Sequence, residues 1–355
     1  MEVLEISKQC AERSIAVIIR FGIDLAKSSF AVCGVDENEH IVLRKTLNRK
    51  QLLHFFANQP PALVAMEAGS GAHHWARELR ALGHDARIID PRLVAPYRQQ
   101  GRTGKNDAND AAAVCEAAAR PSMSFVPVKS PEQQAILMVH RRRHAIVAEH
   151  TRTANQIRGF LAEFGIVVPK GVQVLKQRWS ELRRQFADHL PELAWRELDA
   201  LYARLRELHT QTLAYDRQIN GFVKADRRAQ RLRAINGIGP ITASAIVATV
   251  GNAREFKNGR QLAAWIGLTP RQYSTGGKPR LGRISKRGDC YLRTLLVHGA
   301  RSELMYTPRR TDGKSKWAEN LKARMSWNKA AVALANKHAR IAWAVLANDA
   351  EPLPT

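Results

Sequence analysis

The sequence predicts an α/β domain at the N-terminal end, a long helical spacer in the middle and a mostly helical domain at the C-terminal end. Short apolar runs rich in β-branched residues alternate with helix-like segments in the first third of the chain. A long stretch with helical periodicity follows, and the last part combines Gly-rich turns with Ala-rich helices. We therefore expect boundaries at residues 14–128, 129–230 and 231–347. A chain of 355 residues is long enough for two or three such parts.

The N-terminal part is predicted to begin with three closely spaced strands, which favour an antiparallel meander. Two strands lie within SIAVIIRFGIDLAKSSFAVCGVD (residues 14–36), and HIVLRKTL (residues 40–47) is the third. Helices and strands then alternate, in the order helix 51–58, strand 62–69, helix 72–83, strand 85–90 and a helix within 104–120. The order βββ-α-β-α-β-α is the ribonuclease-H-like layout, in which helices cover a mixed sheet.

The middle part is predicted to be helical over residues 130–165 and again to about residue 230, with a break at FGIVVPKG (residues 164–171). Four leucines in the second stretch are spaced 3-4-3, as in a heptad seam. They are Leu198, Leu201, Leu205 and Leu208. The seam is compatible with packing on a neighbouring helix of the same chain or with a coiled coil between chains. In either case the region is expected to be an arm or spacer between two domains.

The net charge of the chain is +24 at pH 7, which indicates an anionic partner, most commonly nucleic acid. No basic amphipathic anchor, signal peptide or membrane-length apolar run is visible, so we expect no membrane partner. The four cysteines are far apart and form no CxxC pair, which argues against a zinc site or a disulfide framework. We expect a cytoplasmic protein.

Four acidic residues in the N-terminal part are candidate metal ligands. Asp24 and Glu67 follow apolar strand segments, where an unpaired buried carboxylate would be costly. Asp107 and Asp110 are three residues apart at a predicted helix start, so they either favour the positive end of the helix dipole or share a helix face as ligands. Carboxylates gathered at one sheet edge repel each other unless divalent cations such as Mg²⁺ are bound. Two such ions can stabilise both oxygens in phosphodiester cleavage.

INGIGPITASAIVA (residues 235–248) has the pattern of a helix-hairpin-helix motif. Gly237 and Gly239 permit a tight turn, and Pro240 suits the first turn of the next helix. Exposed N–H groups at such a turn can hold a phosphate oxygen without reading the base sequence. The alternative interpretation is a tight connection between two packed helices.

YSTGGKPRLGRISKRGD (residues 273–289) is a basic segment that contains a candidate nucleophile, Ser274. Residues 271–310 hold ten Lys or Arg residues and two acidic ones. From chemistry alone, Ser274 could attack a phosphodiester, or the segment could be a loop that only contacts phosphate. The cations that would stabilise developing charge or bind phosphate are Lys278, Arg280, Arg283, Lys286 and Arg287.

Several segments together resemble the DEDD-type transposases of bacterial insertion sequences, a family associated with bridge-RNA-guided recombination. They are GIDLAK, AMEAGSGAHHWARELRALGH, GKNDANDAAAV, INGIGPITASAI, AAWIGLTPRQYSTGGKPRLGRISKRGD and LRTLLVHGAR. The resemblance extends over residues 16–345. It implies a RuvC-like N-terminal domain whose metal-binding tetrad corresponds to Asp24, Glu67, Asp107 and Asp110, with Mg²⁺ or Mn²⁺ as the cofactor.

The resemblance also implies that the C-terminal transposase domain supplies a nucleophilic serine, matched here by Ser274. Many members carry two adjacent serines, whereas this chain has Thr275 in the second position. The family forms a composite site across the subunits of a dimer or tetramer, and a non-coding guide RNA pairs with donor and target DNA. A bacterial, nucleoid-associated protein is therefore expected.

We expect a DNA recombinase that cuts and rejoins strands through a serine-linked phosphodiester. One alternative is a structure-specific RuvC-like endonuclease of the Holliday-junction resolvase type, which uses metal-activated water. A third possibility is an architectural nucleic-acid-binding protein whose acids are only helix caps and turn residues.

Overall fold

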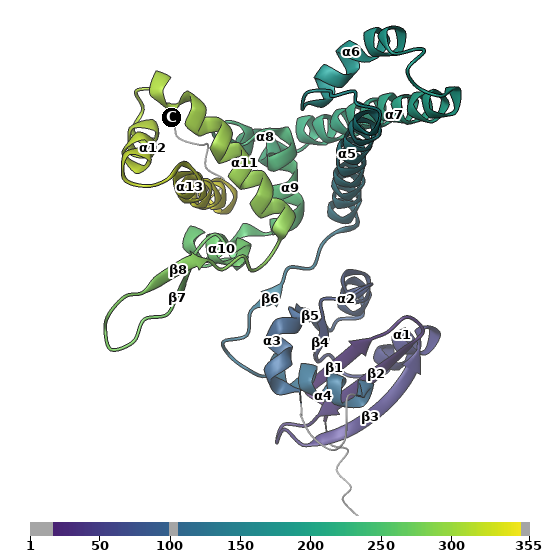
Figure 1. Ribbon diagram of the computed structural model, residues 1–355. Helices are drawn as coiled ribbons and strands as arrows, with labels where there is room; N and C mark the ends of the chain where they lie inside the picture. The colour runs from purple at the N-terminus through teal and green to yellow at the C-terminus, as the bar shows by residue number, and fades with distance from the viewer. Residues whose placement is uncertain (1–16, 99–105, 349–355) are drawn as a thin grey trace, which may run out of the picture. The chain divides into compact units, whose positions relative to one another are not determined.

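The computed structural model describes residues 17–98 and 106–348, and the predicted domain start at residue 14 lies outside this part (Figure 1). The chain divides into two compact units, Met1–Ser130 and Pro131–Thr355. Each unit is described below by itself. Among the described residues, no helix combines the length and apolar character that a bilayer-spanning segment requires.

The first unit is a mixed sheet with helices on both faces, which is compatible with the predicted ribonuclease-H-like layout. Its described strands pair in the order β3-β2-β1-β4-β5-β6. The β1–β2, β2–β3 and β5–β6 pairs are antiparallel, and β1–β4 and β4–β5 are parallel. The strands are β1 (Arg20–Leu25), β2 (Ser29–Val35), β3 (Ile41–Asn48), β4 (Leu63–Glu67), β5 (Asp85–Ile89) and β6 (Phe125–Val126). The helices are α1 (Arg49–Ala57), α2 (Ala72–Ala81), α3 (Pro91–Val94), η1 (Ala95–Tyr97) and α4 (Asp107–Ala118).

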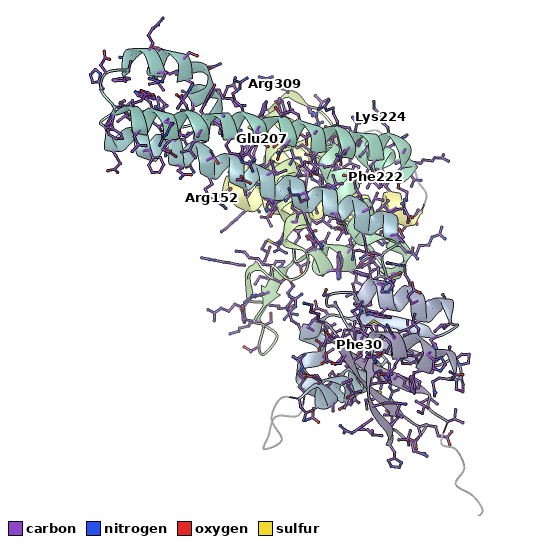
Figure 2. The ribbon with its side chains drawn as sticks, turned by 90° about the vertical axis from the view of Figure 1, so that its right-hand side faces the viewer. Phe30, Arg152, Glu207, Phe222, Lys224 and Arg309 are labelled. Carbon is purple, nitrogen blue, oxygen red and sulfur yellow. The ribbon has the colours of Figure 1, made fainter. Side chains whose placement is uncertain are left out.

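Alternation along the strands sends successive side chains to opposite faces of this sheet. Phe21 and Ile23 of β1 pack in one core with α1 and α2. Phe30 of β2, labelled in Figure 2, belongs to the same core. Its ring meets that of Trp75 of α2 edge to face, with ring centroids 5.1 Å apart. The opposite face packs against α4, which is rich in alanine and therefore lies close to the strands. The residues of β1 and β4 that alternate with the large apolar ones face α4.

The second unit begins with three helices: α5 (Pro131–Glu163), α6 (Val172–Gln185) and α7 (Glu192–Ala225). The pairs Arg204–Glu149 and Arg143–Asp216 show that α5 and α7 run antiparallel. In the predicted seam, Leu198, Leu205 and Leu208 are buried and Leu201 is partly buried. Helices of the same chain therefore cover these leucines, as in the first of the two predicted alternatives.

The rest of the second unit is mostly helical around one large apolar core (Figure 1). Its elements are α8 (Arg227–Arg233), α9 (Pro240–Val250), η2 (Ala253–Glu255), α10 (Gly259–Ile266), β7 (Pro270–Gln272), β8 (Leu281–Ile284), α11 (Cys290–Tyr306), η3 (Thr307–Arg309), α12 (Gly313–Arg324) and α13 (Trp327–Ala347). The sequence did not indicate the two strands, because they are short, exposed and rich in Pro, Arg and Gly. They form an antiparallel hairpin where a loop was expected.

Candidate active site

Asp24 and Glu67 lie at neighbouring positions on the edge of the sheet where β1 and β4 end. In the parallel β1–β4 pair, Ile23 is in register with Met66, so the next residues of the two strands are Asp24 and Glu67. Both are half-buried. They are two residues beyond Gly22 and Ala65, which face α4, and side chains two apart on a strand share a face. Both carboxylates therefore belong to the α4 face of the sheet.

Gly22 allows α4 to lie directly on β1 and so brings Asp110 to the same edge. A Cβ atom at residue 22 would lie 2.2 Å from the backbone oxygen of Ala111 and 2.6 Å from the backbone nitrogen of Cys115. No other residue type could be accommodated without moving the helix. Asp110, one residue before Ala111, is buried in the first turns of α4. The close helix–strand contact thus places Asp110 near the strand ends.

Arg98 joins two of these carboxylates. Its Nη2 atom donates to Glu67 Oε1 at 2.6 Å, and its Nε atom lies 3.0 Å from Asp110 Oδ1. The second contact is an ion pair without hydrogen-bond geometry, and Nε is buried with no hydrogen-bond partner among the described residues. The guanidinium thus offsets part of the negative charge at this acidic edge, which is formed by Asp24, Glu67 and Asp110.

Burial is the largest influence on the pKa of Glu67 and raises it above its ordinary value. Arg98 opposes this effect, whereas the nearby charges of Asp24 and Asp110 raise the pKa further. The structure therefore brings two other predicted acids, Asp24 and Asp110, within electrostatic reach of Glu67. A cation bound at this edge would relieve the repulsion between these carboxylates.

Asp107 is placed differently from the other three acids. It is exposed at the first residue of α4, one turn before Asp110. The N-cap is the neighbouring Asn106, whose side chain accepts from the backbone N–H of Asn109 at 2.8 Å. A helix therefore begins where the acid pair predicted it, but neither aspartate caps it.

The donor set fits a hard divalent cation in its chemistry, because carboxylate oxygens are the ligands that Mg²⁺ prefers. In the part of the chain that the structure describes, no three His, Cys, Asp or Glu side chains are close enough together to hold a metal ion. Arg98 instead pairs with Glu67 and Asp110. A cation at this edge would have to replace the guanidinium as the counter-charge.

Ser274 lies in the β7–β8 hairpin, close to its two-residue turn. Gly276 and Gly277 both have positive φ, 55° and 76°, and Lys278 N–H donates to the carbonyl of Thr275 at 3.1 Å. This is the geometry of a tight hairpin turn that requires glycine at both central positions. The turn therefore explains why two glycines follow Thr275, and it places Ser274 next to a backbone segment of defined conformation.

Two N–H groups donate to the hydroxyl oxygen of Ser274. The backbone N–H of Arg280 lies 3.0 Å away and Gln272 Nε2 lies 2.9 Å away. Donors aimed at this oxygen stabilise negative charge on it. The five cations predicted to bind phosphate are all exposed around or just beyond the hairpin. They are Lys278, Arg280, Arg283, Lys286 and Arg287.

The two glycines of the predicted helix-hairpin-helix motif have different surroundings. Gly237 (φ 84°) connects α8 to α9, and a Cβ atom there would lie 2.6 Å from His338 Cε1 and 2.9 Å from Glu303 Oε2. Close packing against α11 and α13 thus explains Gly237. Gly239 is exposed at the N-cap of α9, with open space around it. Of the two, only Gly239 has open space beside it.

Gly22 and Arg98 also shape this acidic edge, although neither was predicted to be a site residue. The sequence did contain an indication for Gly22, because a glycine between two large apolar residues of a strand often marks a place where another backbone approaches closely. The signal for Arg98 was weaker, because it is one of several basic residues before the acid pair.

Comparisons with known proteins find transposases that match this chain over most of its length. A family model described as "Transposase IS116/IS110/IS902 family" matches residues 229–315, and a DEDD-type IS110 transposase model matches residues 21–166. A probable family 20 transposase of Pseudomonas aeruginosa is 50% identical to this chain over 93% of the chain and 97% of the relative. The transposase for insertion sequence element IS1111A of Coxiella burnetii is 39% identical over 94% and 91%. The transposase for IS1328 of Yersinia enterocolitica is 42% identical over 91% and 95%.

Proposed function

The chain belongs to the DEDD-type transposase family of IS110-like insertion sequences, and from this membership we propose that it cuts and rejoins DNA through a serine-linked intermediate. Ser274 is the proposed nucleophile. Asp24, Glu67, Asp107 and Asp110 are the proposed ligands of Mg²⁺ or Mn²⁺. The observation that carries the proposal is the gathering of Asp24, Glu67 and Asp110 at one sheet edge.

In the proposed reaction, Ser274 Oγ loses its proton and forms a bond to the phosphorus atom. The bond between phosphorus and one bridging deoxyribose oxygen breaks, and that oxygen takes up a proton. Rejoining is the reverse reaction with the hydroxyl of another strand, which restores the serine. Because each step exchanges one phosphodiester for another, no nucleotide cofactor is required.

The hairpin residues have distinct proposed tasks in this reaction. Arg280 N–H and Gln272 Nε2, which donate to Ser274 Oγ, would orient the oxygen and stabilise its charge during attack. The side chains of Lys278, Arg280 and Arg283 would hold the non-bridging phosphate oxygens. Thr275, exposed in the turn, is a proposed supporting hydroxyl. When bound, the divalent cation would polarise the phosphate and neutralise charge on the leaving oxygen.

A guide RNA and a dimer or tetramer are further parts of the proposal. The acids belong to the first compact unit and Ser274 belongs to the second. A composite site could therefore take its acids from one subunit and its serine from another. Mixing an Asp110→Ala chain with a Ser274→Ala chain tests this arrangement. Activity of the mixture, when each chain alone is inactive, is the expected result.

The test of the serine intermediate is incubation with the flanking DNA, the element's RNA and Mg²⁺. The wild-type chain should give a covalent protein–DNA adduct on a denaturing gel. Ser274→Ala should give none, while retaining its fold and its nucleic-acid binding. An adduct of unchanged yield in that variant would place the nucleophile elsewhere.

One observation favours the alternative of a RuvC-like endonuclease that uses metal-activated water. All four acids belong to a unit that does not contain Ser274. This alternative predicts cleavage without any adduct and no effect of Ser274→Ala. The same gel therefore separates the two functions.

A further inference from the structure

A groove of about 1200 Å³ lies in the second unit, between the start of α10, the start of α12 and one face of α13. Pro270 and Ile284, at the base of the β7–β8 hairpin, also line it. Figure 1 shows this hairpin extending from the region of α10. The groove therefore reaches the base of the element whose turn region carries Ser274.

The charged residues that line the groove are all cations. They are Arg260, Lys314, Lys329, Lys337 and Arg340. Lys314 pairs with Glu303, but in the described part of the chain the other four have no carboxylate partner. Arg260, Lys329 and Arg340 are exposed and Lys337 is half-buried. The rim thus has an uncompensated positive charge that suits a polyanion.

Lys314 adds a cation in the groove wall. Its side chain is 7% exposed, and its Nζ atom lies 2.8 Å from Glu303 Oε1 without hydrogen-bond geometry. Glu303 also contacts His338 at 2.6 Å. The ammonium therefore keeps unused donor capacity, because an ammonium has three N–H groups. Its charge, partly balanced by Glu303, adds to the positive potential of the groove wall.

Apolar and aromatic side chains supply much of the remaining lining, including Val332, Ile341 and Trp317. Lys337 Nζ lies 4.3 Å from the centroid of the Trp317 ring, so the groove has an aromatic ring and a cation side by side. Double-stranded nucleic acid keeps its base faces stacked inside the helix, and only unpaired bases can lie against such a surface. An apolar recess with a cationic rim therefore suits a single strand better than a duplex.

We propose that this groove binds a single-stranded nucleic-acid segment, with its bases in the recess and its phosphates on the rim. The inference rests on the proposed function, since it adds a path by which an unpaired strand reaches the hairpin of Ser274. Lys329, Lys337 and Arg340 contact phosphates, and Trp317 contacts a base. The strand is either DNA opened at the recombination site or RNA, and both present the same chemistry to the groove.

The test uses the full chain with Ser274→Ala, in EDTA, so that no covalent step contributes to binding. Fluorescein-labelled 12-nucleotide probes are compared by anisotropy: single-stranded DNA, single-stranded RNA, and a DNA duplex. The triple variant Lys329→Ala/Lys337→Ala/Arg340→Ala should bind the single strands about tenfold more weakly and show a shallower salt dependence. Its loss of duplex binding should be smaller than threefold. Lys224→Ala, an exposed lysine of α7 outside the groove, is the matched control and should change neither (Figure 2).

A second measurement identifies the contact directly. A single strand that contains 5-iodouracil should crosslink to peptides from α12 or α13, and Trp317→Phe should bind more tightly than Trp317→Ala. The relative affinities of the DNA and RNA probes decide the source of the strand. Equal losses for single strand and duplex, crosslinks only outside the groove, or equal binding of an oligoglutamate peptide would each overturn the proposal. None of these results depends on the Ser274 adduct, so the groove and the serine mechanism can fail separately.

Discussion

The guanidinium of Arg98 lies 2.6 Å from the carboxylate of Glu67, at the edge where β1 and β4 end. The same group lies 3.0 Å from Asp110. Arg98 is therefore the counter-charge of an acidic edge that the proposed reaction assigns to a divalent cation. Guanidinium and metal ion would compete for the same carboxylates.

Removing Arg98 should strengthen binding of a divalent cation. We expect Arg98→Ala to melt at a lower temperature in EDTA, because the carboxylates then repel one another without compensation. Its affinity for Mn²⁺ should rise about threefold to tenfold, a modest change since the pair is partly exposed. Calorimetric titration with Mn²⁺ measures the affinity. Arg92→Ala, which removes a similar pair with Asp90, should leave it unchanged. Equal Mn²⁺ affinity in the Arg98→Ala and wild-type chains would contradict the competition.

Asp24→Ala or Asp110→Ala should abolish excision while DNA or RNA binding survives. These carboxylates are proposed to hold the cation, whereas the cationic hairpin would supply most of the phosphate contacts. The measurements are an excision assay and a gel-shift assay on the same preparations. Asp85→Ala serves as the control, because Asp85 lies at the start of β5, away from the strand ends that carry the acids, and its side chain pairs with Arg87. Wild-type recombination in either of the first two variants would refute the metal-binding tetrad.

Gly22→Ala should destabilise the first unit. The added Cβ would meet the backbone of Ala111 at 2.2 Å, and α4 can escape only by moving away from β1. We expect a loss of about 1–3 kcal/mol in the free energy of unfolding, measured by urea denaturation. Gly159→Ala in α5 has nothing within 4 Å and should be neutral or slightly stabilising. Similar stabilities for Gly22→Ala and the wild-type chain would show that α4 does not lie as closely on β1 as described.

Glu303 should make stability depend on pH in the acidic range. Burial is the largest influence on its carboxyl and raises the pKa, but His338 and Lys314 together hold the pKa below the ordinary value of 4.5. A carboxyl with a lowered pKa in the folded state stabilises the protein above the unfolded value, and this stabilisation is lost as pH falls through the folded value. Glu303→Gln should cost about 3–5 kcal/mol at pH 7, because Lys314 is left buried without a counter-charge.

The cost of Glu303→Gln should therefore shrink when unfolding is measured below pH 4.5. Glu116→Gln, which removes an exposed pair with Arg120, should show a small effect at both pH values. A cost of Glu303→Gln that is independent of pH would mean that this carboxyl is not ionised in the folded chain.

The sequence was sufficient to predict the mixed sheet, because its strands are short β-branched runs separated by clear helix signals. The proximity of Asp24, Glu67 and Asp110 followed from their positions at strand ends and at a helix start. The exposed position of Asp107 could not be predicted. The i, i+3 spacing indicates that Asp107 and Asp110 share a helix face, but it does not indicate how the helix is rotated relative to the sheet. The close packing of α4 on the sheet depends on Gly22 and the alanines of that helix, which are about 90 residues apart in sequence.

The hairpin and the groove were beyond sequence reasoning for different reasons. Each strand of the hairpin has at most four residues and lacks the alternation of apolar and polar residues that would predict a strand. The hairpin is recognised only from its backbone hydrogen bonds and from the turn at Gly276 and Gly277. The groove is built from α10, α12 and α13, and its cations are separated by up to 80 residues. Only tertiary packing brings them together.

The most direct test of the central claim is the mass of the peptide that remains attached to DNA after the reaction is stopped and the protein is digested. The serine mechanism predicts one modified peptide, which contains Ser274, requires Mg²⁺ or Mn²⁺, and disappears in Ser274→Ala and in Asp110→Ala. Cleaved DNA with no attached peptide, or an attached peptide that does not include Ser274, would contradict the mechanism.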